Sequence, residues 1–264
     1  IKKRTTDLLK TSGVLIAAAL LAIAINAGSL LTTYEYSRYS MRGDSNELTI
    51  DSQNSQHGLD KEYITQWSYG IGEIWTLLIP NFKGGASLGT LSSKSATANE
   101  LRKMGVQNVD QIMDEMALPL YWGKQPITSG PVYIGAIVCF LFILGIFLVE
   151  NRYKWWLLTA TILSVFLAWG KNFMPFTEFF IDYVPLYNKF RAVSMALVIA
   201  GFCMPLMGIM ALRNIFTQQV TKDQARIALF CAAGITGFFC LLFAAFPDMA
   251  GNFKSPMDTQ LTGQ

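Results

Sequence analysis

Five long apolar stretches without a single charged side chain constrain this chain more than any other feature. They cover residues 14–31, 132–149, 155–169, 192–212 and 227–246, and none contains Asp, Glu, Lys, Arg or His. A helix that crosses the hydrocarbon core of a bilayer needs about 20 mostly apolar residues. A soluble helix would instead show a polar face at the 3.6-residue period, and these stretches show none. The sequence therefore predicts an all-α membrane protein, a multi-span helical bundle with about five transmembrane helices.

The composition agrees with a membrane protein, and its pattern divides the chain into four parts. Hydrophobic residues make up 52% of the 264 residues and charged residues 15%, whereas soluble domains carry about 25% charged residues. We predict a cytoplasmic start and first span over 1–31, and a mixed, partly helical extracytoplasmic loop with an interfacial helix over 32–131. A four-span helical bundle over 132–246 and an extracytoplasmic tail over 247–264 follow. Because the chain begins with Ile1 and stops in that polar tail, we expect it to be a piece of a longer protein.

Lys and Arg residues near the spans set the predicted orientation. Cytoplasmic loops are enriched in these residues, and a cytoplasmic amino terminus places nine of them there, from Lys2 to Arg226, against three acidic residues. The long segment 32–131 and the short segment 170–191 then lie outside. All four cysteines fall inside predicted spans, and no CxxC or Cys/His spacing suggests a metal site. The single His57, in a polar stretch, receives no role.

The segment 67–85 is far more apolar than a solvated loop. Trp67, Ile71, Ile74 and Leu78 share one face at helical spacing, which is typical of a helix lying in the membrane interface. The alternative is that this segment packs as the core of the exported loop. Glu73 lies within it, and the sequence leaves three roles open for its carboxylate: a structural hydrogen-bond acceptor, a general base, or an acceptor for a sugar hydroxyl.

Two further segments of the loop carry readable patterns. Thr97 to Glu100 form a capping-box pattern. The apolar residues after it predict one amphipathic helix: Leu101, Met104, Val109, Ile112, Met113 and Met116. Over 121–133, Tyr121, Trp122 and Gln125 belong to a cluster of aromatic, amide and hydroxyl side chains immediately before the second span. Such a cluster suits carbohydrate, because a sugar offers apolar C–H faces and many hydroxyls, and it suits the membrane interface equally.

A cationic pair precedes the fourth span. Lys189 and Arg191 lie at its amino-terminal end, where the helix dipole favours an anion, and Arg binds phosphate through two parallel hydrogen bonds. We therefore predict a phosphate contact at the outer surface, with snorkelling to lipid phosphates as the alternative. In the same loop Glu178 and Asp182 are four residues apart, so a helix would place them on one face. That pair suits a metal ion, acid/base work or a solvated surface.

Four segments resemble the YfhO family of large bacterial membrane proteins, and they are most similar to members from the Bacteroidetes. In chain order they are TTYEYSRYSMRG at 32–43, QWSYGIGEIWTLLIPNFKGG at 66–85, YWGKQPITSGPVYIGA at 121–136 and PLYNKFRAVSM at 185–195. Members of this family are similar to glycosyltransferases of the GT-C class. Those are multi-span enzymes that transfer a sugar from a polyprenyl-phosphate carrier on the non-cytoplasmic face of the membrane.

The resemblance implies that the chain is part of a GT-C-like glycosyltransferase in the bacterial inner (cytoplasmic) membrane. Its partners would be membrane lipid, the polyprenyl-phosphate-linked sugar and a cell-envelope polysaccharide or glycan acceptor, but not nucleic acid. No cofactor and no metal ligand set is assigned. The carrier phosphate would meet Arg191 and Lys189. The residues that would line the sugar side are Trp67, Tyr69, Glu73, Tyr121, Trp122 and Gln125.

The resemblance assigns no catalytic residue to this chain. In the GT-C class the catalytic carboxylate lies in the first exported loop, close to the amino terminus, and we expect that loop to precede Ile1. Two other classes of function stay open: a lipid-linked sugar transporter or scramblase, and a non-catalytic envelope-assembly membrane subunit. The spans contain no Asp, Glu, Lys, Arg or His, which argues against ion-coupled transport. Labelled carrier lipid separates the three classes by product formation, lipid movement without chemistry, or neither.

Overall fold

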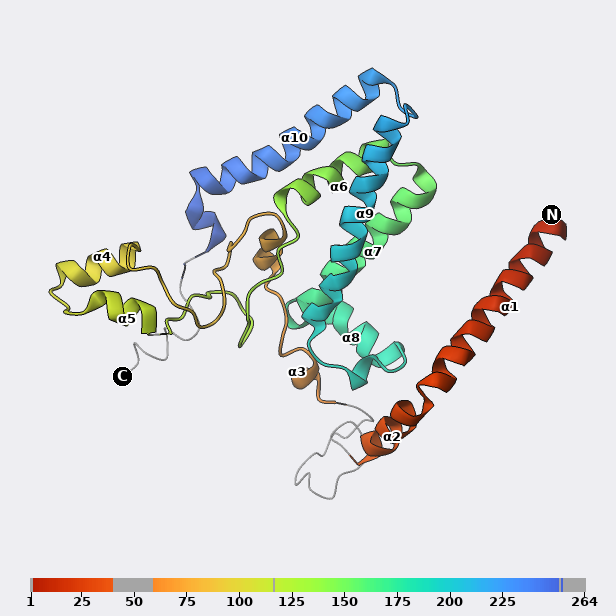
Figure 1. The fold of residues 1–264 in the computed structure, drawn as a ribbon, viewed down its shortest axis with the longest axis horizontal. Helices are drawn as coiled ribbons and strands as arrows, with labels where there is room; N and C mark the ends of the chain where they lie inside the picture. Colours follow the sequence, from red (N-terminus) through yellow and green to blue (C-terminus); the bar gives the residue numbers. More distant parts are fainter. Residues whose placement is uncertain (1, 40–58, 116, 252, 254–264) are drawn as a thin grey trace. The chain divides into compact units, whose positions relative to one another are not determined.

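A bent pair of helices makes up the described part of the first unit of the chain. The computed structural model describes residues 2–39, 59–115, 117–251 and 253, and it divides the chain into two units, Ile1–Asp60 and Lys61–Gln264. In the first unit α1 (Lys2–Ile25) and α2 (Ala27–Arg38) meet at an angle of 71° (Figure 1). The bend falls at Asn26, whose Nδ2 donates to the carbonyl oxygen of Ala22 at 2.9 Å. Side-chain bonding to the preceding turn bends helices, so the predicted first span, 14–31, is not one straight helix.

Four helices of the second unit form its main core. They are α6 (Ala136–Leu148), α7 (Asn151–Trp169), α9 (Leu197–Phe216) and α10 (Lys222–Ala245). α9 packs against α6 and α7, while α10 packs against α6 (Figure 1). The buried side chains between them are almost all aliphatic, sulfur-containing or small: Leu144, Leu148, Ala168, Leu197, Ala200, Met204, Met207, Ala211, Ala228 and Ala232.

Two glycines allow α6 and α9 to approach closely. A Cβ atom at Gly145 in α6 would lie 2.5 Å from Cγ of Met207 and 2.9 Å from its carbonyl oxygen. A Cβ atom at Gly208 in α9 would lie 2.8 Å from Cβ of Leu141. Small residues at such contacts are typical of helix pairs inside membranes.

Among the described residues, three helical stretches are long and apolar enough to cross a membrane, judged by length and composition. They are Asn151–Tyr183, Val193–Phe216 and Lys222–Ala245, and the bent pair of the first unit makes a fourth if it counts as one span. The prediction of a helical membrane protein is confirmed at this level, and the count of five spans is not. The predicted third span, 155–169, lies within α7, which continues through η2 (Gly170–Phe173) into α8 (Met174–Tyr183).

The predicted second span, 132–149, is only partly helical. α6 has 13 residues, which at about 1.5 Å per residue gives about 20 Å, short of the roughly 30 Å of a hydrocarbon core. Gly135 adopts φ 117°, and its N–H donates to the carbonyl oxygen of Leu77 at 3.1 Å. The apolar residues before it are therefore a connection that packs against the preceding loop segment.

The predicted extracytoplasmic loop, 32–131, is largely irregular. Its described residues form no strand, only isolated bridges such as that of Gly84 with Tyr121. The predicted single amphipathic helix is two helices, α4 (Ala96–Lys103) and α5 (Val109–Glu115). Positive φ angles of 80° at Gly105 and 57° at Asn108 break it. The N-cap is Ser95 and not Thr97, because the side-chain oxygen of Ser95 accepts from the N–H of Ala98 at 3.2 Å. Met116, the last apolar residue of the predicted helix, lies outside the described residues.

The apolar segment 67–85 packs into the main core. It begins after the short helix α3 (Lys61–Ile64) and contains the 3-10 helix η1 (Ile71–Leu77). Leu77 and Leu78 are buried with α6, whereas Ile71 is 56% exposed. The single apolar face expected from Trp67, Ile71, Ile74 and Leu78 is therefore divided, because a 3-10 helix has 3.0 residues per turn. The alternative placed the segment in the core of the exported loop, but Leu77 and Leu78 are instead buried in the core of the helix bundle.

Candidate functional site

Arg191 lies in a strained connection directly before α9. The connection holds η3 (Tyr187–Lys189) and η4 (Val193–Ala196). Leu186 and Ala192 on either side of Arg191 have φ angles of 68° and 64°. Each such left-handed residue with a side chain costs about 1–3 kcal/mol, and conformations of this kind concentrate at ligand-binding segments.

Two aromatic rings hold the guanidinium group of Arg191. Its Cζ lies 5.1 Å from the ring centre of Tyr63 and 5.0 Å from that of Trp67. Nη1 also donates to the hydroxyl oxygen of Tyr63 at 2.5 Å. Cation–π contacts of this length are attractive by about 0.5–1 kcal/mol at exposed sites. The rings therefore restrict the orientation of a side chain that remains exposed to solvent.

The main chain of residues 67–69 is fastened between α7 and η4. The N–H of Tyr69 donates to the carbonyl oxygen of Ala168 at 2.8 Å, and the N–H of Ser194 donates to that of Trp67 at 3.2 Å. The buried hydroxyl oxygen of Ser68 accepts from the N–H of Lys171 at 2.9 Å. These bonds place Trp67 beside Arg191, although 124 residues separate the two in the sequence.

Arg191 borders an apolar cavity of about 340 Å³. Apolar side chains supply most of its wall, and Arg191 is the charged residue among those that line it: Ile64, Tyr187, Phe190, Arg191, Ala192, Val193, Met195 and Ala196. Lys189, half-buried in η3, is not among these lining residues. Of the predicted cationic pair, the structure thus brings only Arg191 to the cavity.

A second group of the predicted residues forms a buried polar network around Glu73. The carboxylate is 1% exposed and accepts three hydrogen bonds. Its donors are the hydroxyl of Tyr121, the N–H of Gly70 at 2.5 Å and the N–H of Lys124 at 3.3 Å. A buried carboxylate requires such hydrogen-bond partners. Of the three roles left open for Glu73, this geometry fits that of a structural hydrogen-bond acceptor.

Tyr69 and Gln125 complete this network. The hydroxyl oxygen of Tyr121 accepts from the N–H of Gln125 at 3.0 Å, and that of Tyr69 accepts from the N–H of Val132 at 2.7 Å. The side chain of Gln125 is buried, and its Nε2 has no partner among the described residues. Gly123 makes room for the network, because a Cβ there would overlap Oε1 of Glu73.

Burial controls the proton equilibria of this network. Burial first, and the neighbouring Glu73 carboxylate second, raise the pKa of Tyr121 well above its ordinary value. Burial likewise raises the pKa of Tyr69. Burial lowers the pKa of Lys83, an effect that Glu73 opposes and Lys124 reinforces. Both phenols therefore stay protonated at neutral pH, and Tyr121 acts as a hydrogen-bond donor.

Trp122 lies apart from both groups. Its ring packs edge-on against Phe253, with the ring centres 5.7 Å apart. It lines a separate apolar cavity of about 440 Å³ next to Leu78 and Phe243. The predicted sugar-side residues are thus spread over three places: Trp67 at Arg191, a buried network of Tyr69, Glu73, Tyr121 and Gln125, and Trp122 at the second cavity.

The paired carboxylates Glu178 and Asp182 share one face of α8, as their spacing predicted, and both face Lys61. The Lys61 Nζ lies 3.3 Å from Oε1 of Glu178 and 3.9 Å from Oδ1 of Asp182. Within the described part of the chain, no group of three or more His, Cys, Asp or Glu side chains is placed to hold a metal ion. All four cysteines are free, and His57 lies outside the described residues.

Sequence reasoning missed three residues of these sites. Tyr63 belongs to a four-residue helix without a readable pattern, and nothing in the sequence pairs it with Arg191. Lys124 and Asn172 join the loop to η2, because Nζ of Lys124 donates to Oδ1 of Asn172 at 3.2 Å and Nδ2 of Asn172 donates to the carbonyl oxygen of Tyr69 at 2.7 Å.

A scan against protein-family models and searches of curated proteins and of solved structures gave no match for this chain. The resemblance to the YfhO family therefore stays a prediction from the quoted segments.

Proposed function

We propose that the chain is part of a membrane-embedded GT-C-like glycosyltransferase, and that Arg191 holds the phosphate of a polyprenyl-phosphate sugar donor. The donor would pass its sugar to a cell-envelope acceptor on the non-cytoplasmic face. The observation that carries the proposal is the aromatic clamp of Arg191 by Tyr63 and Trp67 at the edge of an apolar cavity.

The clamp suits a phosphate joined to a hydrocarbon chain. A guanidinium group has five N–H donors in one plane, and two parallel N–H groups can donate to two oxygens of the same phosphate. Tyr63 accepts from one of the two Nη atoms, and the described residues provide no carboxylate in an ion pair with Arg191. Because the rings already restrict the side chain, binding would order it at little further cost in entropy.

The apolar wall supplies the second half of the match. Ile64, Val193 and Met195 line the cavity next to the guanidinium group, and a hydrocarbon chain gains about 0.8 kcal/mol for each buried CH₂ group. The position directly before a candidate span, Val193–Phe216, would set the phosphate at the level of the lipid headgroups. With the amino terminus in the cytoplasm, that level is the outer leaflet.

Substitution of Arg191 tests this proposal through binding. Hydrogen bonds to charged groups contribute about 1.5–3 kcal/mol, so Arg191→Ala should weaken binding of undecaprenyl phosphate in lipid nanodiscs by about 10- to 100-fold. Arg191→Lys keeps the charge but loses the paired donors, and it should recover only part of the affinity. Arg213→Ala, at the other end of α9, is the matched control and should leave the affinity unchanged.

Two results would contradict the proposal. Unchanged affinity in Arg191→Ala would exclude the phosphate contact. Equal affinity of the wild-type protein for undecaprenyl phosphate and for phosphatidic acid would mean that Arg191 meets bulk lipid phosphates by snorkelling. In the full-length protein, labelled donor lipid could move between leaflets without forming a glycosylated product. That result would mean that the protein is a scramblase and not a transferase.

A further inference from the structure

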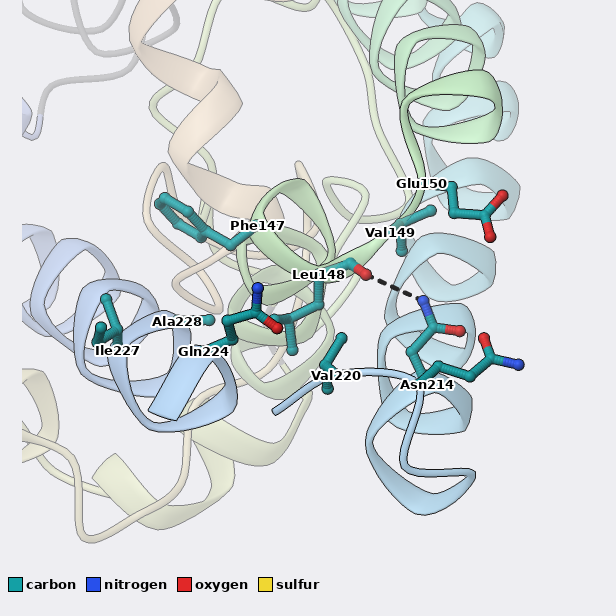
Figure 2. A pocket seen from close by; sticks show the side chains of 10 residues that line it. Phe147, Leu148, Val149, Glu150, Asn214, Val220, Gln224, Ile227 and Ala228 are labelled. Atoms are coloured by element: carbon teal, nitrogen blue, oxygen red, sulfur yellow. Dashed lines mark hydrogen bonds between the residues drawn. The ribbon is translucent and has the colours of Figure 1, made fainter. Parts of the chain in front are cut away.

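A third cavity lies at the opposite end of α9 from Arg191. It has a volume of about 430 Å³ and sits where the carboxyl-terminal ends of α6 and α9 meet the amino-terminal end of α10 (Figure 2). α9 has 20 residues, so about 30 Å of helix separates this cavity from the Arg191 site. If α9 spans a bilayer, the two cavities belong to different leaflets.

The cavity is lined by both polar and apolar side chains. Figure 2 shows Glu150 and Asn214 on one side of Leu148, and Phe147 and Ile227 on the other, together with the amide of Gln224. The apolar side chains are open to their surroundings, since Phe147 is 48% and Ile227 63% exposed. A ligand that fills both sides must therefore carry a polar group next to a hydrocarbon group.

The polar side offers hydrogen-bond acceptors. Glu150 occupies the N-cap position of α7, but its side chain makes no capping bond, and no ion pair to it is found among the described residues. The nearby cations of Arg152 and Lys154 instead face the rings of Tyr153 and Trp155 at 5.6 and 5.9 Å.

The amide of Asn214 adds a second acceptor. Its Nδ2 donates to the carbonyl oxygen of Leu148 at 2.9 Å (Figure 2). This bond fixes the amide so that its Oδ1 is left to accept. A carboxylate and an amide oxygen together complement a group that carries a positive charge and N–H donors.

We propose that this cavity binds the headgroup of a phospholipid with a primary ammonium group, of the phosphatidylethanolamine type. The ammonium group donates to the carboxylate of Glu150 and to Oδ1 of Asn214, and the acyl chains lie along Phe147 and Ile227. Lys222 and Arg226 do not line the cavity, but they are exposed in the first two turns of α10 and would add positive charge near its lining residues for the lipid phosphate. Choline headgroups lack N–H donors, and glycerol headgroups lack the positive charge.

Native mass spectrometry of the purified chain tests this proposal. The probes are equal amounts of dioleoyl phosphatidylethanolamine, phosphatidylcholine and phosphatidylglycerol in mixed micelles, and the measured quantity is the ratio of bound lipids. We expect the wild-type protein to retain the ethanolamine lipid preferentially. Because exposed ion pairs contribute little, Glu150→Gln should lower the ratio of ethanolamine to choline lipid by about two- to fivefold.

The control is Glu100→Gln, which removes an exposed carboxylate from α4 and should leave the ratio unchanged. Equal retention of the three lipids by the wild-type protein would overturn the proposal, as would an unaltered ratio in Glu150→Gln. Equal retention is also the result expected if another protein segment, and not a lipid, covers the cavity. None of these outcomes depends on Arg191 or on sugar transfer.

Discussion

Removing the hydroxyl of Tyr121 should destabilise the fold far more than the loss of one oxygen atom suggests. Tyr121 is 4% exposed and Glu73 1% exposed, so water cannot replace the lost donor. A hydrogen bond to a charged group contributes about 1.5–3 kcal/mol. Tyr121→Phe also leaves the N–H of Gln125 without its acceptor, which costs about 1 kcal/mol more. Together these losses predict a decrease of about 2.5–4 kcal/mol in the free energy of unfolding.

Thermal unfolding in detergent measures this decrease. For a protein of this size 1 kcal/mol shifts the midpoint by about 2–4 °C, so Tyr121→Phe should unfold about 5–16 °C below the wild type. Tyr183→Phe is the control, because Tyr183 is 74% exposed and exposed substitutions change stability by about 0.5 kcal/mol or less.

A double-mutant cycle assigns the effect to the pair. Glu73→Gln keeps the shape of the side chain but removes its charge, so in that background Tyr121→Phe should cost at least about 1 kcal/mol less than in the wild type. A loss below about 0.5 kcal/mol in the single variant, or strictly additive losses in the cycle, would refute the view of Glu73 as a buried carboxylate that depends on Tyr121.

The remaining predictions concern the helix contact and alkaline pH. Gly145→Ala should destabilise the protein by about 1–3 kcal/mol through overpacking against Met207, whereas Gly201→Ala on α9, with open space around it, should be neutral or stabilising when unfolding is followed in parallel. Because burial raises the pKa of Tyr121 and Tyr69 above 10.0, their contribution to stability is complete below pH 10. It should fall above pH 10 by up to about 1.4 kcal/mol per pH unit for each hydroxyl. Unfolding between pH 8 and 11.5 checks this sign, and a midpoint that rises with pH would contradict it.

Apolar length predicted the two longest bundle helices but not the structure of every apolar run. The runs 192–212 and 227–246 lie almost wholly in helical stretches that can span a membrane. The run 132–149 does not, because hydropathy counts apolar residues whether or not they are helical. Gly135 and its bond to Leu77 turn the first part of that run into a connection, and no local pattern reveals a partner so far away in the sequence.

For the candidate sites, the sequence likewise identified chemically suitable residues but not which of them lie together. Arg191, Trp67, Glu73 and Tyr121 stood out because each is a polar or aromatic residue in an unusual setting. Their grouping did not follow from the sequence, since Glu73 and Tyr121 are 48 residues apart. Two glycines carried a usable signal, because Gly70 and Gly123 leave room for the carboxylate of Glu73 and stand directly beside nominated residues.

The bonds that fasten residues 67–69 impose an order of events on biosynthesis. Lys171, which donates to Ser68, is made 103 residues later. At a translation rate of about 5–20 residues per second, Lys171 is added about 5–20 s after Ser68. Ser194, the partner of Trp67, is added later still. During that interval Tyr69, Leu77 and Leu78 have no helix bundle to cover them. Until the later helices have been made, these apolar side chains stay exposed to water or to the bilayer surface, which makes this stage of synthesis prone to aggregation.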